Sequence, residues 1–238
     1  MNLVVDGGNT RFKVGLFSGV DLQEKFLFSS APELFSYLAH QQADRALVST
    51  VKFSGEEILN KITASKKYLL THTLPLPIKV QYQTPQSLGV DRIAAACGVA
   101  SLFPGQDCLA IDAGTCINYE LVTGEGNYMG GGISPGLSMR LKAMHTFTER
   151  LPEVPLDEFT PLVGQTTESC MQSGVLHGTV AEIEGVIERY REKYPHIRAV
   201  LCGGDTNFFE NRLKQPIFAA PDLVLVGLNR ILLHNAQL

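Results

Sequence analysis

The sequence Leu3-Val4-Val5-Asp6-Gly7-Gly8-Asn9-Thr10 has a counterpart in the middle of the chain, Leu109-Ala110-Ile111-Asp112-Ala113-Gly114-Thr115. Each copy places an Asp after three apolar residues, a Gly two positions later and a Thr just beyond it. A second stretch rich in β-forming residues follows each copy, at residues 12–17 and 117–122. We therefore predict two strand-turn-strand units, each with a carboxylate at the end of its first strand.

These two turns have the composition of a phosphate-binding site. Backbone N–H groups and hydroxyls of a Gly-containing turn can bind phosphate, and an adjacent Asp can recruit a cation. A single Asp-Gly turn between apolar runs is equally the usual signal of a β-hairpin. Because the pattern occurs twice, we favour phosphate binding and expect the two turns to face each other across a cleft that holds a nucleotide triphosphate.

The composition is that of a soluble globular protein, with 45% hydrophobic and 18% charged residues in 238. A net charge of −4 without a basic block gives no indication of a nucleic-acid partner. No apolar run reaches the roughly 20 residues that span a bilayer, and the first residues do not have a signal-peptide pattern. Five cysteines without a C-x-x-C pair indicate reduced thiols. We expect a cytoplasmic protein without a membrane partner.

Apolar periodicity predicts the remaining elements. The predicted strands cover residues 46–51 and 199–202, and the predicted helices cover residues 31–41, 90–103, 137–145, 168–194 and 223–234. Thr167 is placed at the start of the long helix, where its hydroxyl can cap free N–H groups. Strands and helices alternate in two successive halves that each open on an Asp turn. This pattern predicts a duplicated α/β fold with halves at residues 1–108 and 109–238.

Two other segments contain candidate functional residues. In Gly89-Val90-Asp91-Arg92, at a predicted helix start, Gly lets a ligand approach, Asp91 can accept a proton and Arg92 can bind a carboxylate. The structural alternative is that Asp91 only stabilises the first turn of the helix and that Arg92 is solvated. Gly203-Gly204-Asp205 follows a buried strand and could let an adenine ring lie against the backbone, although a Gly-Gly turn alone is a weak signal.

The order of these motifs along the chain resembles that of the type III pantothenate kinases. The matching motifs are Asp6-x-Gly-Asn-Thr10 with Lys13, Gly89-x-Asp91-Arg92, Asp112-x-Gly-Thr115 and Gly131-Gly132-x-Ser134-Pro135-Gly136. That family belongs to the superfamily of sugar and acetate kinases, heat-shock ATPases and actin. The resemblance therefore implies duplicated ribonuclease-H-like domains of the actin-like ATPase superfamily, with the nucleotide in the cleft between the halves.

The resemblance also implies an activity, the ATP-dependent phosphorylation of pantothenate to 4′-phosphopantothenate, the first step of coenzyme A biosynthesis. It implies ATP with Mg²⁺ and a monovalent cation (K⁺ or NH₄⁺), the latter at Asp112, and Asp91 as the catalytic proton acceptor. The ATP-binding residues would be Asp6, Gly7, Gly8, Asn9, Thr10, Arg11, Phe12, Lys13 and Thr115. The pantothenate-binding residues would be Tyr82, Gly89, Val90, Asp91, Arg92 and Thr167.

Gly174 and Gly178 share one face of the helix at 168–194, where either a second copy or the protein's own core could pack closely. The resemblance favours the second copy and implies a homodimer. Two positions depart from the family pattern. Glu120 stands where relatives commonly have Asp, and Cys116 stands where a small apolar residue is usual. Neither change removes a carboxylate or hydroxyl from the expected site.

Two alternatives to pantothenate phosphorylation stay open. One is another small-molecule kinase of the same superfamily that acts on a sugar or on acetate, for which 238 residues leave little room for a sugar-binding insertion. The other is a nucleotide-binding regulator without catalysis. The presence of Asp91 argues against the regulator, because a protein that only binds nucleotide does not need a proton acceptor.

Overall fold

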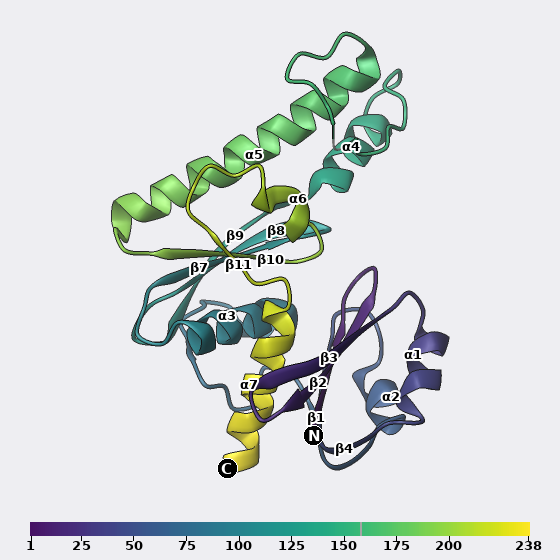
Figure 1. The fold of residues 1–238 in the computed structure, drawn as a ribbon, viewed down its shortest axis with the longest axis vertical. Coiled ribbons are helices and arrows are strands. Elements are labelled where there is room, and N and C mark those ends of the chain that lie inside the picture. The colour runs from purple at the N-terminus through teal and green to yellow at the C-terminus, as the bar shows by residue number, and fades with distance from the viewer. Residues whose placement is uncertain (158) are drawn as a thin grey trace. The chain divides into compact units, whose positions relative to one another are not determined.

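The computed structural model describes residues 1–157 and 159–238, and in this part of the chain the strands form two β-sheets (Figure 1). The strands of the first sheet are β1 (Asn2–Gly7), β2 (Phe12–Ser18), β3 (Asp21–Phe28), β4 (Gln42–Thr50) and β5 (Thr63–Leu69). Their order is β3-β2-β1-β4-β5, with β1, β2 and β3 antiparallel and β4 parallel to both β1 and β5.

The second sheet repeats this order. Its strands are β6 (Lys79–Val80), β7 (Cys108–Ala113), β8 (Cys116–Val122), β9 (Asn127–Pro135), β10 (Arg198–Cys202) and β11 (Phe218–Ala219). From β9 the order runs β9-β8-β7-β10-β11, which corresponds strand for strand to the first sheet, and β6 is added beside β9. In both copies the Asp turn joins the first two strands, at β1 and β2 and at β7 and β8. The predicted duplicated α/β fold is confirmed.

The helices are α1 (Ala31–Leu38), α2 (Gly55–Asn60), α3 (Val90–Leu102), α4 (Leu137–Thr146), α5 (Thr167–Lys193), α6 (Thr206–Glu210) and α7 (Leu223–Gln237), with a short 3₁₀ turn at Pro85–Ser87. They include every helix that the periodicity predicts, with ends that differ by a few residues.

The predicted helix cap at Thr167 is wrong. Thr166 is the cap, because its hydroxyl accepts the Ser169 N–H at 3.1 Å while the Ser169 hydroxyl accepts the Thr166 N–H at 2.9 Å. A cap is strengthened when the residue three positions later can return the hydrogen bond. Thr166 has Ser169 in that position, whereas Thr167 has Cys170. Thr167 is the first residue of α5.

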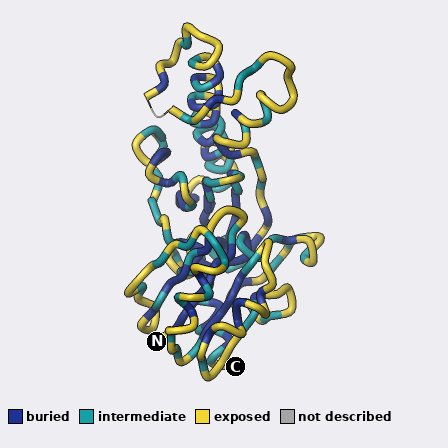
Figure 2. The backbone as a smooth tube through the Cα atoms, turned by 90° about the vertical axis from the view of Figure 1, so that its right-hand side faces the viewer, coloured by how far each residue is buried: buried dark blue, intermediate teal, exposed yellow. Residues whose placement is uncertain are grey.

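The core of the first sheet lies between its strands and the helices α1 and α2. Apolar side chains of β1, β2 and β4 pack there on Leu34, Leu38 and Ile58, and Figure 2 shows buried backbone along the strands and exposed backbone in most loops. Elsewhere α7 contacts β1 and β4, and α3 packs on α7. This helix pair is very close, since a Cβ on Gly227 would lie 1.8 Å from the Ala94 carbonyl oxygen.

The chain divides into two compact units. The first consists of residues 1–108, 120–130 and 222–238, and the second of residues 109–119 and 131–221. The C-terminal helix α7 therefore belongs to the same unit as the N-terminal sheet. The division into sequential halves at 1–108 and 109–238 stays a prediction. In the described part of the chain, no helix has both the length and the apolar character that crossing a membrane requires.

Candidate active site

The first Asp turn closes tightly at the end of a buried strand. The Gly8 N–H donates to the Arg11 carbonyl oxygen at 3.1 Å. A Cβ on Gly7 would lie 2.8 Å from the hydroxyl oxygen of Thr50, so glycine is required there for β1 to lie this close to β4. Asp6 is only 7% exposed, although it lies next to a solvent-exposed turn. The exposed residues of this turn are Asn9, Thr10 and Arg11.

Phe12 and Lys13 follow this turn and differ in what they can offer a ligand. The Phe12 side chain is 2% exposed and packs on Phe53, with 4.7 Å between the ring centroids, so only its backbone is available to a phosphate. Lys13 is half-buried and is the cross-strand partner of Asp6 in the β1–β2 ladder. Cross-strand partners share a face of the sheet, so both residues project from the same face beside the turn.

The second Asp turn has a similar construction. Asp112 is half-buried near the end of β7, and the Gly114 N–H donates to the Cys116 carbonyl oxygen at 2.9 Å. Thr115 is exposed at the tip of the turn. Gly136 holds the turn from the other side, because its N–H donates to the Thr115 carbonyl oxygen at 3.1 Å.

The Gly203–Asp205 segment packs directly on this second turn. Gly203 has a φ of +94°, and a Cβ there would lie 2.3 Å from Oδ1 of Asp112, so both the conformation and the contact require glycine. The Asp205 N–H donates to the Ala113 carbonyl oxygen at 2.9 Å, and burial raises the pKa of the Asp205 carboxyl. Gly203 therefore shapes the surroundings of Asp112, while the contact of the Gly203–Asp205 segment with an adenine ring stays a prediction.

Asp91 lies in the first turn of α3, directly after the helix begins at Val90. Its carboxylate accepts the Arg92 N–H at 2.9 Å and is half-buried. A Cβ on Gly89 would lie 2.5 Å from Oδ1 of Asp91, so glycine leaves room for this carboxylate. Asp91 is thus a half-buried carboxylate in the first turn of the helix, packed against the glycine that precedes it.

Arg92 is buried, at 8% exposure, and is not the solvated residue of the structural alternative. Its Nε donates to Oε1 of Glu120 at 2.6 Å, and its Nη2 donates to Oε2 at 3.0 Å. Tyr128 donates its hydroxyl to the same Oε2 at 2.5 Å, and the guanidinium carbon lies 5.7 Å from the ring centroid of Tyr82. Arg92 is therefore held in one orientation by a bidentate ion pair and an aromatic ring.

The electrostatics of this pair reflect its burial. Burial alone would lower the pKa of Arg92, but the hydrogen bonds and charge of Glu120 outweigh it and raise that pKa. Burial raises the pKa of the Glu120 carboxyl, and the hydrogen bonds from Arg92 and Tyr128 act against that rise. Burial and the neighbouring Glu120 charge also raise the pKa of Tyr128, so its hydroxyl stays a donor.

Glu120 and Tyr128 are the residues near the candidate site whose roles the sequence analysis missed. Glu120 is fully buried in β8, and a charged residue inside an apolar strand needs a partner. That signal could have marked Glu120, but the sequence does not identify Arg92 as its partner.

Thr167 is exposed at the start of α5 and lines a cavity of about 580 Å³ in the second unit. The other lining residues are Met144, Leu151, Gly164, Gln165, Thr166, Cys170 and Met171. The cavity is lined by both apolar side chains and hydroxyls, which suits a small organic molecule with polar groups.

The predicted site residues are distributed over the two units. Residues 6–13, Tyr82 and residues 89–92 belong to the first unit, and Asp112, Thr115 and Thr167 belong to the second. The structure brings Tyr82 together with Arg92, and Gly89 with Asp91, within the first unit. The shared nucleotide site with Asp6 and Asp112 across a cleft stays a prediction.

The carboxylates suit a magnesium ion that is bound mainly through the nucleotide. In the described residues, no group of three or more His, Cys, Asp or Glu side chains is arranged to hold a metal. Mg²⁺ at phosphate sites is usually held by one or two carboxylates together with phosphate oxygens and water. Single carboxylates such as Asp6 and Asp112 meet that requirement.

A family model described as type III pantothenate kinase matches residues 2–189. The chain belongs to the type III pantothenate kinase family. A type III pantothenate kinase of Cytophaga hutchinsonii is 43% identical, over 99% of this chain and 100% of that protein. One of Bacteroides fragilis is 45% identical, over 99% of this chain and 98% of its own length.

Solved structures of low sequence identity have the same fold as this family member. A Campylobacter jejuni protein described as a Baf family transcriptional activator has a TM-score of 0.66 at 20% identity, over 99% of this chain and all of that one. A ROK hexokinase from Thermus thermophilus has a TM-score of 0.52 at 13% identity, over 98% of this chain and 99% of the hexokinase. These likenesses confirm the actin-like ATPase and sugar-kinase fold class.

Proposed function

We propose that this protein is a pantothenate kinase that transfers the γ-phosphoryl group of ATP to the primary hydroxyl of pantothenate. The product is 4′-phosphopantothenate, and the reaction is the first step of coenzyme A biosynthesis. The observation that carries the proposal is the Gly89–Arg92 segment at the start of α3, where a half-buried carboxylate lies beside a buried guanidinium, in a member of this family. We expect the protein to act in the cytoplasm.

The mechanism follows from what phosphoryl transfer requires, namely positioning of the reactants and neutralisation of charge. The N–H groups and hydroxyls of the Asp6–Lys13 turn and of Thr115 bind the ATP phosphates. Asp91 accepts the proton of the pantothenate hydroxyl while its oxygen forms a bond to the γ-phosphorus, and the bond to the β-phosphate oxygen breaks to release ADP. When bound, Mg²⁺ near Asp6 and a monovalent cation at Asp112 offset phosphate charge.

Arg92 is suited to bind the carboxylate of pantothenate. A guanidinium has five N–H donors, and the ion pair with Glu120 uses Nε and one N–H of Nη2. We assign another of its N–H groups to the substrate carboxylate, with the Tyr82 ring beside it. Since Glu120 fixes the plane of the guanidinium, this recognition costs little side-chain entropy on binding.

The proposed function is tested by measuring ADP release with pantothenate, acetate and a panel of sugars as acceptors. ADP release that depends on pantothenate supports the proposal. Release with acetate or a sugar in its place would identify another kinase of the superfamily. Nucleotide binding without ADP release for any acceptor would identify a regulator.

Potassium or ammonium should raise the turnover relative to sodium at fixed Mg²⁺. The half-buried Asp112 carboxylate near the end of β7 provides a hard oxygen ligand beside the second turn. A cation there offsets the phosphate charge that repels the attacking oxygen. Steady-state rates in matched KCl, NH₄Cl and NaCl buffers measure the effect, and equal rates in all three would contradict a monovalent-cation site.

A homodimer built partly on α5 is the assembly that we propose. Gly174 and Gly178 are exposed on this helix. Apart from the neighbouring residues and backbone of α5 itself, no atom in the described part of the chain lies within 4 Å of a Cβ built on either glycine. This open stripe argues against packing on the protein's own core and leaves room for the backbone of a second copy. Thr167, at the start of the same helix, would then join a pantothenate pocket that is shaped by the dimer.

We expect sedimentation at micromolar concentration to give twice the 26.0 kDa chain mass. Gly178→Glu should shift the protein to the monomer without unfolding it, because the new side chain meets open space in the single chain. A parent protein that sediments at 26.0 kDa would contradict the dimer.

A further inference from the structure

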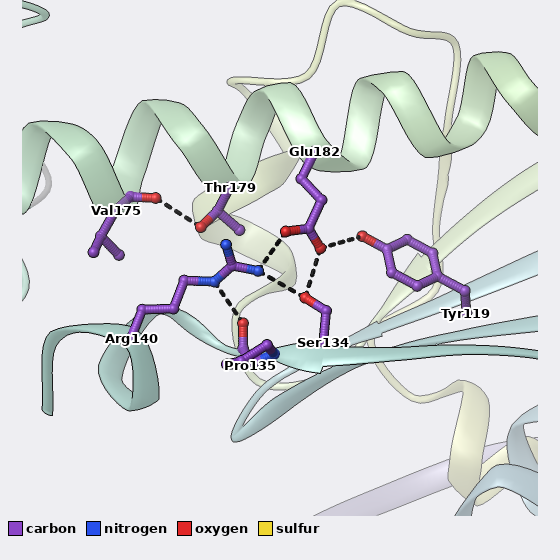
Figure 3. A network of polar contacts seen from close by, with 7 residues as sticks. All are labelled: Tyr119, Ser134, Pro135, Arg140, Val175, Thr179 and Glu182. Atoms are coloured by element: carbon purple, nitrogen blue, oxygen red, sulfur yellow. Dashed lines mark hydrogen bonds and ion pairs between the residues drawn. The ribbon is translucent and has the colours of Figure 1, made fainter. Parts of the chain in front are cut away.

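Glu182, near the middle of α5, accepts hydrogen bonds from three other elements of the second unit (Figure 3). The Tyr119 hydroxyl of β8 donates to Oε1 at 3.2 Å, and the Ser134 hydroxyl of β9 donates to the same oxygen at 2.5 Å. The Arg140 guanidinium of α4 donates to Oε2 at 2.5 Å. One carboxylate therefore joins α5 to β8, β9 and α4.

Arg140 gives this network a second set of bonds. Its Nη2 also donates to the Ser134 hydroxyl at 2.7 Å, and its Nε donates to the Pro135 carbonyl oxygen at 2.7 Å. The Arg140 and Glu182 side chains are 23% and 29% exposed, so water screens their ion pair only in part. Partial burial alone would raise the pKa of Glu182, but the donors Ser134 and Arg140 outweigh it and hold that pKa below its ordinary value.

The network is connected to the second Asp turn through Gly136. Gly136 follows Pro135, and its carbonyl oxygen accepts the Arg140 N–H at 3.0 Å. Its own N–H donates to the Thr115 carbonyl oxygen at 3.1 Å. A Cβ on Gly136 would lie 2.0 Å from the Gly114 carbonyl oxygen, so the two backbones are in direct contact. Residues 134–136 are thus one of the segments that support the turn.

We propose that Glu182 and Arg140 are positioning residues for the turn at Gly114–Thr115, which they hold through Ser134–Gly136. This inference rests on the proposed function, in which Thr115 binds ATP phosphates. Neither side chain needs to touch the nucleotide. A displacement of about 1 Å in a binding group can cost up to about 100-fold in rate, so fixing the turn has a large effect on nucleotide use.

The test replaces Glu182 with Gln, which keeps the size of the side chain but removes the charge that pairs with Arg140. We expect the Kd and KM for ATP to rise by about 10-fold to 100-fold, while the KM for pantothenate changes by no more than about 2-fold. Glu184→Gln is the matched control. Glu184 lies on the same helix and accepts the Lys214 N–H at 2.7 Å, and this contact does not involve the turn. The Glu184→Gln protein should have the same Kd and KM for ATP, and the same KM for pantothenate, as the parent.

A Glu182→Gln protein that melts at the parent temperature and binds ATP as tightly as the parent would overturn the inference. An equal loss of affinity for both substrates would also overturn it, because that is the result of a general structural defect. If Glu182→Gln does not fold, Ser134→Ala provides the same test, since it removes the two hydrogen bonds that the Ser134 hydroxyl makes with Glu182 and Arg140 and keeps the ion pair. We expect a smaller rise in the Kd for ATP, and an unchanged Kd would overturn the inference.

Titration with a nucleotide needs no acceptor substrate. An enzyme that binds ATP but does not phosphorylate pantothenate would contradict the proposed function. The effect of Glu182→Gln on the Kd for ATP could still be measured in that enzyme. Normal pantothenate phosphorylation with an unaffected Glu182→Gln variant would contradict only the positioning role.

Discussion

Asp91→Asn should lower the turnover by about 10²-fold to 10⁴-fold and leave ATP binding nearly unchanged. The amide is close in size to the carboxylate and can still accept the Arg92 N–H, so the start of α3 should keep its structure. It cannot take the proton from the attacking hydroxyl, which is the role that the mechanism gives to Asp91. The measurements are kcat from ADP release and the Kd for ATP from a separate titration.

The structural alternative predicts a different result for the same variant. An acidic residue that only stabilises a helix terminus contributes about 0.3–1 kcal/mol, and its loss would leave catalysis close to normal. Glu57→Gln is the matched control, because Glu57 is an exposed acidic residue in the first turn of α2, outside the candidate site. An Asp91→Asn enzyme that keeps more than about a tenth of the parent rate would contradict the assignment as general base.

The repeated Asp turn, together with the alternation of strands and helices, predicted the duplication because the turn marks the same place in both sheets. Strands β1 and β7 are buried and apolar, so their runs are recognisable, and each carboxylate follows such a run. The edge strands β3 and β5 of the first sheet were not predicted. Most of their residues are polar and exposed, and charged edges of this kind weaken the apolar alternation by which strands are recognised.

The candidate site was predictable wherever its residues are neighbours in sequence. Gly89 and Asp91 form such a local group, and a helix start explains their arrangement. Long-range partners were not predictable, because periodicity shows that a residue is buried but not what it contacts. The bonds from Arg92 to Glu120 and from Arg140 to Glu182 join residues far apart in the chain and depend on the folded sheet. The choice of Thr166 over Thr167 as helix cap depended on a reciprocal bond with Ser169.

Glu120→Gln should destabilise the protein strongly, by about 3–5 kcal/mol in the free energy of unfolding. Glu120 is 0% exposed and Arg92 is 8% exposed, so removal of one charge leaves the other buried without compensation. Tyr128→Phe is the milder companion, since it deletes only the 2.5 Å hydrogen bond to Oε2 and should cost about 1.5–3 kcal/mol. Urea unfolding followed by circular dichroism measures both. A Glu120→Gln protein within about 1 kcal/mol of the parent would show that the pair adds little to stability.

Replacement of both partners separates stability from substrate binding. In Arg92→Met/Glu120→Met no buried charge is left unpaired, and apolar side chains of similar length fill the space, so most of the lost stability should return. The double variant has no guanidinium for the pantothenate carboxylate, so its KM for pantothenate should rise while its Kd for ATP stays near the parent value. If the ion pair has only a structural role, the double variant should regain most of the parent's stability and should also have the parent KM for pantothenate. A stable double variant with a normal KM for pantothenate would therefore remove Arg92 from the substrate site, and a stable one with a raised KM would place the buried pair in substrate recognition.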